Sequence, residues 1–205
     1  MKWLKEQNRR TREFIRGEFA PSAQMTGIAF AALLVLGFVL GFVFRDMAEN
    51  FLALFTANLA GSGIVDEDGT IHLLPLLGNN IRAAIATIFY GLFPFLFLPA
   101  LSLGINSMLI GFLAAFYVEN GMNMLYFFAA IVPHGIFELP ALIIAIALGL
   151  YLCRTITDFV RHDTKGVVKT ALQDVTRVLC LRAIPLFVIA SVIECYITPR
   201  IAGLI

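Results

Sequence analysis

Long runs of apolar residues dominate the pattern of this chain. A helix needs roughly 20 apolar residues to cross a bilayer, and residues 25–44 form one uncharged run of that length. Residues 83–118 form a second uncharged run, which is long enough for two crossings. Because Pro94 and Pro99 interrupt this run, we expect a helical hairpin that bends near residues 94–102.

Two later segments complete the pattern. Residues 122–152 contain one charged side chain, Glu138, and residues 183–199 also contain one, Glu194. The sequence therefore predicts an all-α fold, a polytopic bundle of about five transmembrane helices that forms a single transmembrane domain. The predicted crossings are residues 25–44, 80–97, 101–118, 122–152 and 183–199.

The connections between these helices differ in charge. The N-terminal stretch 1–24 and the connection 153–182 are rich in Lys and Arg, whereas the connection 45–79 carries five acidic residues against the single Arg45. Basic connections stay on the cytoplasmic side of a membrane. We therefore expect the N-terminus inside and the C-terminus outside, and five crossings place both basic segments on the same side.

The same connections contain apolar residues at helical spacing. The pattern runs through residues 154–181 and, on the outer side, through residues 47–59, which precede the acidic turn 66–68. Trp3 and its apolar neighbours hint at a similar helix near the N-terminus. Such segments are typical of amphipathic helices that lie on a membrane surface; a partner-docking surface is the alternative.

Composition agrees with a membrane location. Hydrophobic residues make up 60% of the 205 residues and charged residues only 14%, whereas about a quarter of a soluble domain is charged. The net charge of +1 gives no indication of a nucleic-acid partner. We expect a multi-pass protein of the cytoplasmic membrane whose main partner is the lipid bilayer.

Small residues at helical spacing predict where helices approach closely. We expect these contacts to form within one chain, with a homodimer as the alternative. The residues concerned are Gly37 and Gly41 in the first crossing, and Gly104, Ser107, Gly111 and Ala115 in the third.

A few polar residues lie inside the apolar segments, where a charge costs about 2.5–3.5 kcal/mol. His134 and Glu138 are four residues apart and share one helix face. Pro140 removes a backbone hydrogen bond and Gly135 adds freedom, so a kinked or broken helix is expected here. Together with Glu194 and polar residues at the starts of the second and third crossings, they form a candidate intramembrane polar cluster. Its members are Asn79, Asn80, Arg82, Asn106, His134, Glu138 and Glu194.

Three hypotheses explain this cluster. In the first it is structural, with Arg82 neutralising a glutamate and the asparagines hydrogen-bonded. In the second, His134, Glu138 and Glu194 bind Zn²⁺ or another divalent cation through nitrogen and oxygen ligands. In the third, a substrate or proton pathway runs through the kinked helix. The sequence has none of the common catalytic or nucleotide-binding motifs, so no catalytic residues are assigned.

Several of these residues carry a family resemblance. The residues concerned are Asn79-Asn80 with Arg82, Asn106 with Gly111, the motif His-Gly-x-Phe-Glu-Leu-Pro-Ala at 134–141 and the motif Glu-x-Tyr-Ile-Thr-Pro at 194–199. Together they resemble the pattern of the stage II sporulation protein M family. The resemblance implies a small membrane protein with five crossings. In sporulating bacteria it implies a scaffold that recruits peptidoglycan-degrading enzymes during engulfment.

From this resemblance we expect a non-enzymatic membrane scaffold or assembly protein whose partners are other membrane or cell-envelope proteins. The alternatives are a transporter or channel for an ion or small solute, and a metal-dependent intramembrane hydrolase. In the hydrolase, a bound metal ion would activate water while one glutamate served as base.

Overall fold

The computed structural model describes residues 2–66, 69–163 and 166–204, and within these ranges the chain is all-α apart from an isolated bridge between Val65 and Ile71. Two of the three acidic residues of the 66–68 turn lie outside the described residues. The elements are α1 (Lys2–Phe14), the π-helical turn η1 (Ile15–Phe19), α2 (Ala20–Val43), α3 (Arg45–Ala60), α4 (Leu73–Tyr90), α5 (Pro99–Glu119), α6 (Met124–His162), α7 (Val167–Val178), the π-helical turn η2 (Leu179–Ala183), α8 (Ile184–Tyr196) and α9 (Thr198–Ala202).

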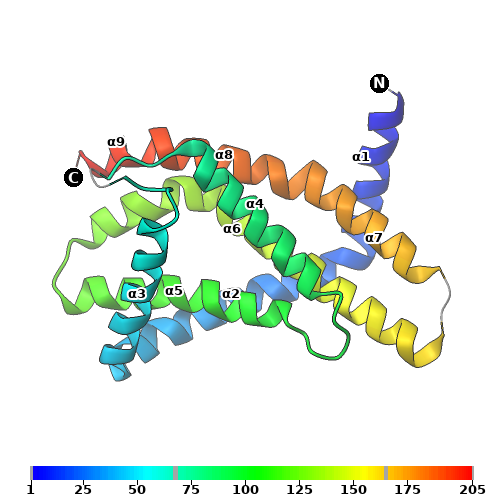
Figure 1. Ribbon diagram of the computed structural model, residues 1–205, viewed down its shortest axis with the longest axis horizontal. Helices are drawn as coiled ribbons and strands as arrows, with labels where there is room; N and C mark the ends of the chain where they lie inside the picture. Colours follow the sequence, from blue (N-terminus) through cyan, green and yellow to red (C-terminus); the bar gives the residue numbers. More distant parts are fainter. Residues whose placement is uncertain (1, 67–68, 164–165, 205) are drawn as a thin grey trace.

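Four continuous helical runs are long and apolar enough to cross a membrane. They are Lys2–Val43, Pro99–Glu119, Met124–His162 and Val167–Ile201. The 18-residue α4 is not among them because it carries Asn79, Asn80 and Arg82. Nevertheless α4 packs against α6 and α8. Figure 1 shows α2, α5 and α8 running in one direction and α4 and α6 in the other.

The predicted bend in the second apolar run is present, with shifted boundaries, but α4 and α5 contact each other little and pack mainly against other helices. Its first helix begins at Leu73, seven residues before the predicted residue 80, because the preceding Leu-rich stretch continues the same helix. The bend occupies residues 91–98, and Phe95 and Phe97 adopt positive φ angles there. The Phe95 amide donates a hydrogen bond to Thr157 Oγ1 (3.1 Å), which fastens the bend to α6.

Helix α6 is the longest element, with 39 residues, and it contains both Pro133 and Pro140. The sequence predicts a kinked or broken helix here; the helix is continuous through both prolines and, as Figure 1 shows, changes direction along its length, so it is kinked and not broken. Its N-terminus is capped by the Asn123 side chain, which accepts from the Leu125 amide (2.9 Å). The helix extends ten residues beyond the predicted end at residue 152.

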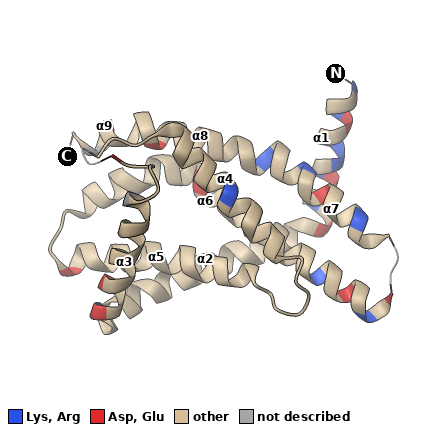
Figure 2. Ribbon diagram, in the orientation of Figure 1, with Lys and Arg blue, Asp and Glu red and all other residues tan. Residues whose placement is uncertain are grey.

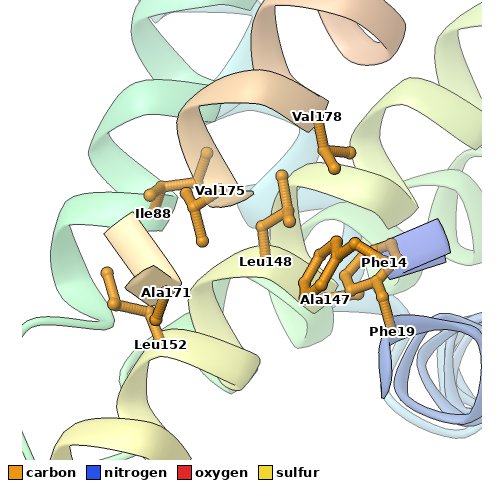
Figure 3. Packing of buried hydrophobic residues seen from close by; sticks show 9 residues of the cluster. All are labelled: Phe14, Phe19, Ile88, Ala147, Leu148, Leu152, Ala171, Val175 and Val178. Carbon is orange, nitrogen blue, oxygen red and sulfur yellow. The ribbon is translucent and has the colours of Figure 1, made fainter. Parts of the chain in front are cut away.

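The basic connection 153–182 does not form a single surface helix. Its first part continues α6 and its second part is α7, which packs back against α6. The apolar face of α7 is covered by protein, since it belongs to one buried cluster together with side chains from α6, α4 and the N-terminal helix (Figure 3). The cluster consists of Phe14, Phe19, Ile88, Ala147, Leu148, Leu152, Ala171, Val175 and Val178. Amphipathicity in α7 therefore reflects intramolecular packing.

Helix α1 runs across the direction of the apolar helices, and charged residues gather toward two ends of the bundle (Figures 1 and 2). Most Lys and Arg residues lie in α1, α7 and the C-terminal part of α6, whereas α3 and the end of α5 carry acidic residues. Acidic residues also lie among the cations of α1, α6 and α7, so the two ends differ in net charge, one basic and the other acidic.

Glycines set the contact between α2 and α5, as the small-residue pattern predicts for packing within one chain. A methyl group at Gly37 would lie 2.9 Å from the Met108 Cα, and one at Gly111 would lie 2.6 Å from the Phe38 amide nitrogen. By contrast, a methyl group at Gly104 would have no neighbour within 4 Å. Gly104 therefore does not belong to this interface.

Gly111→Ala should lower thermal stability in detergent, because the added methyl group forces two backbones apart; overpacking of this kind costs about 1–3 kcal/mol. Gly104→Ala is the matched control and should leave the unfolding midpoint unchanged or raise it, since alanine is the better helix former. Equal midpoints for the two variants would contradict the close α2–α5 contact.

Candidate functional site

Three of the predicted polar residues converge between α6 and α8. His134 and Glu138 occupy successive turns of α6, and Glu194 lies in the last turn of α8. One nitrogen or oxygen atom from each residue lies within 4.8 Å of the other two. Glu194 follows Glu138 by 56 positions in the sequence, and the packing of α6 against α8 and α9 brings it beside His134 and Glu138. We call these three residues the His–Glu–Glu cluster.

His134 has contacts through both ring nitrogens. Nε2 lies 3.7 Å from Glu138 Oε2, and Nδ1 lies 3.4 Å from the hydroxyl oxygen of Thr198 at the start of α9. The side chains of His134 and Glu138 are 14% and 26% exposed, and Thr198 is buried. The imidazole therefore connects the Glu138 carboxylate to α9.

The electrostatics of the His–Glu–Glu cluster require compensation. Two carboxylates at this separation disfavour each other's charged form, and their location on apolar helices removes the solvation that would offset this. Among the described residues, neither glutamate forms an ion pair with a lysine or arginine; His134 is the basic group beside them. Either protons or a bound cation must balance the two glutamates.

Two further polar groups, one on α8 and one on α4, have no hydrogen-bond partner in the described part of the chain. Ser191 is fully buried and lies one turn before Glu194 on α8, so that both side chains share a helix face. The amide nitrogen of Asn80 is also buried without a partner, on α4, which packs against both α6 and α8. A buried polar group without a partner costs about 1–3 kcal/mol, so a water molecule or ligand at either atom would stabilise the folded protein.

The remaining predicted members do not bond to the cluster. Arg82 is exposed and lines an apolar groove on α4 with Ile85 and Phe89, and within the described ranges it forms no ion pair. Asn79 is exposed, and Asn106 donates to the Ser102 carbonyl of its own helix (2.8 Å). Neutralisation of a glutamate by Arg82, as the structural hypothesis requires, is therefore not found among the described residues.

Two residues of the site were not singled out from the sequence. Thr198 belongs to the late Ile-Thr-Pro motif, and Ser191 precedes Glu194 by three residues. The sequence does contain a signal for Ser191, because a residue three positions before Glu194 shares its helix face. Thr198 lies beyond the end of α8, so its approach to His134 depends on how α9 packs against α6.

Comparison with known proteins identifies a family. The family model for stage II sporulation protein M matches residues 29–199, a range that includes all three members of the cluster. No solved structure matches the chain.

Two uncharacterized proteins of Methanocaldococcus jannaschii are similar to the chain. One is 28% identical over 67% of this chain and 61% of its own length, so the chain spans less than two thirds of that relative. The other is 28% identical over 83% of this chain and 94% of its own length. Because the family model covers most of the sequence, the chain belongs to the stage II sporulation protein M family.

Proposed function

We propose that this protein is a non-enzymatic scaffold of the cytoplasmic membrane, and that a divalent cation bound by His134, Glu138 and Glu194 ties α6 to α8. The cation site rests on one observation, that ligand atoms of these three residues converge from two helices. The scaffold role itself is supported by membership of the family and by the α-helical bundle, in which each long helix packs against others.

We propose five crossings with the N-terminus inside and the C-terminus outside. The alternating directions of α2, α4, α5, α6 and α8 support this count, with α4 as the fifth crossing (Figure 1). Separation of the basic and acidic ends supports the orientation, since basic segments stay in the cytoplasm.

The donor set supports a cation. Imidazole nitrogen and carboxylate oxygen suit Zn²⁺ at distances of about 2.0–2.2 Å, which places two tetrahedral ligand atoms roughly 3.3 Å apart. His134 Nε2 and Glu138 Oε2 are 3.7 Å apart, and the three ligand atoms lie within 4.8 Å of one another, so the side chains have to move closer together to share one ion. A divalent charge would also balance the two carboxylates.

Two other functions each have one observation in their favour. Three protein ligands leave a fourth position open, as in catalytic zinc sites, which favours a metal-dependent hydrolase. The change of direction in α6 near the polar residues favours transport of an ion or small solute. The scaffold proposal requires neither turnover nor flux.

Elemental analysis of the purified protein after incubation with Zn²⁺ or Mn²⁺ should find about one ion per chain. His134→Ala and Glu194→Gln should each weaken binding at least tenfold, because each removes a ligand. His162→Ala is the matched control, since His162 is exposed on the same helix, away from the cluster, and its ring nitrogen Nδ1 lies 3.2 Å from the Asp158 carbonyl of its own helix. Absence of stoichiometric metal after supplementation, or equal binding in all variants, would overturn the cation site.

Labelling with a membrane-impermeant maleimide tests the orientation. In a cysteine-free background, Ser62→Cys, in the connection after α3, should react in intact cells. His162→Cys, at the basic end of α6, should react only after the membrane is opened. The reverse pattern would show that the N-terminus lies outside.

Flux into proteoliposomes distinguishes the scaffold from a transporter. We expect uptake of monovalent ions, divalent ions and small solutes to equal uptake into empty vesicles. Uptake above this level that disappears in Glu138→Gln would contradict the scaffold and establish transport through the cluster.

A further inference from the structure

A basic pocket lies between the N-terminal helix and the start of α8, away from the His–Glu–Glu cluster at the other end of that helix. It has a volume of about 590 Å³. Its lining consists of Lys5, Asn8, Arg9, Arg12, Glu13, Arg16 and Arg182. Five of the seven side chains are cationic and one is acidic, so the pocket carries a strong excess of positive charge.

Most of this charge is not neutralised within the protein. Arg9 pairs with Glu6 and Glu13, both at 2.7 Å. In the part of the chain that the structure describes, Lys5, Arg12 and Arg16 form no ion pair, although they are close enough to line one pocket. Cations held together without a counter-charge repel each other and favour an anionic ligand.

Both π-helical turns contribute to the pocket. Arg16 lies in η1 and Arg182 lies in η2. The Arg182 guanidinium donates to Asn8 Oδ1 (3.2 Å), which joins the second turn to α1. Single π turns occur frequently at functional sites because they redirect side chains out of the regular helical pattern.

The pocket lies where basic sequence gives way to apolar sequence in two helices. The apolar run of α2 follows η1, and the apolar α8 begins directly after η2. Trp3 and Leu4 on α1 are 72% and 48% exposed, and α1 runs across the apolar helices. Exposed apolar side chains on such a helix are typical of the interface between lipid tails and headgroups.

We propose that this pocket binds the phosphate group of an anionic phospholipid. Guanidinium groups suit phosphate because their planar donors form paired hydrogen bonds with its oxygens. The position of the pocket at the apolar boundary selects a lipid phosphate over a soluble one, because the acyl chains continue along α2 and α8. Basic pockets between membrane helices bind such headgroups by the same chemistry.

The test uses the full chain purified in an uncharged detergent. The probe is short-chain phosphatidylglycerol, compared with short-chain phosphatidylcholine and with inorganic phosphate at matched ionic strength. A ligand that binds the folded state raises the unfolding midpoint, and we expect phosphatidylglycerol to raise it most. In the double variant Arg12→Gln/Arg16→Gln the half-saturating concentration should increase about 25-fold, at about fivefold per cation.

Arg154→Gln is the control, because Arg154 is exposed on the C-terminal part of α6 and does not line the pocket. It should retain the full response to phosphatidylglycerol. An equal shift with phosphatidylcholine, or an unchanged response in the double variant, would overturn the proposal. A shift with inorganic phosphate as large as that with phosphatidylglycerol would also overturn it, by identifying a soluble ligand. Each outcome is independent of metal content.

Discussion

Close packing around α6 is the constraint on which the rest of the structure depends. All three buried apolar clusters in the described part of the chain include residues of this helix. Ala141, Ala145 and Ala147 are fully buried, and their small side chains allow α4 and α8 to approach. Lipid tails are as apolar as leucine, so helices in a bilayer associate through close packing and polar contacts more than through the hydrophobic effect. Helix α6 allows such close packing, because the surface that it presents to its neighbours contains small alanine side chains.

The bend in α6 connects this packing to the polar cluster. Pro133 and Pro140 lie on either side of His134 and Glu138, where each proline removes one backbone hydrogen bond. Beyond the second proline the buried alanine surface begins, and it holds α8 against α6. Apolar contacts elsewhere in the bundle thereby hold Glu194 beside Glu138.

The sequence predicted the class of fold, and three of the residues that it grouped in one polar cluster lie together in the structure. A run such as 25–44 predicts a membrane-spanning helix unambiguously, because it is both long enough and apolar enough for a bilayer. The spacing of four residues places His134 and Glu138 on the same face of any helix. Arg82 was grouped with them because it lies near the same end, but its orientation depends on the rotation of α4, which the sequence leaves open. The amphipathic pattern of α7 predicted a helix on the membrane surface, whereas in the structure the apolar face of α7 packs against α6. Periodicity alone cannot distinguish lipid from a neighbouring helix as the partner of an apolar face. Neither π turn had a sequence signal.

Helix α8 has an additional mechanical consequence. It carries Glu194 in its last turn and begins two residues after Arg182, which lies in η2. Arg182 and Glu194 are twelve positions apart, or about 18 Å along the axis. A helix of this length behaves as a stiff rod. An axial displacement of one end therefore appears at the other with nearly the same amplitude, so that α8 physically connects the basic pocket at Arg182 to the His–Glu–Glu cluster without any opening through the bundle.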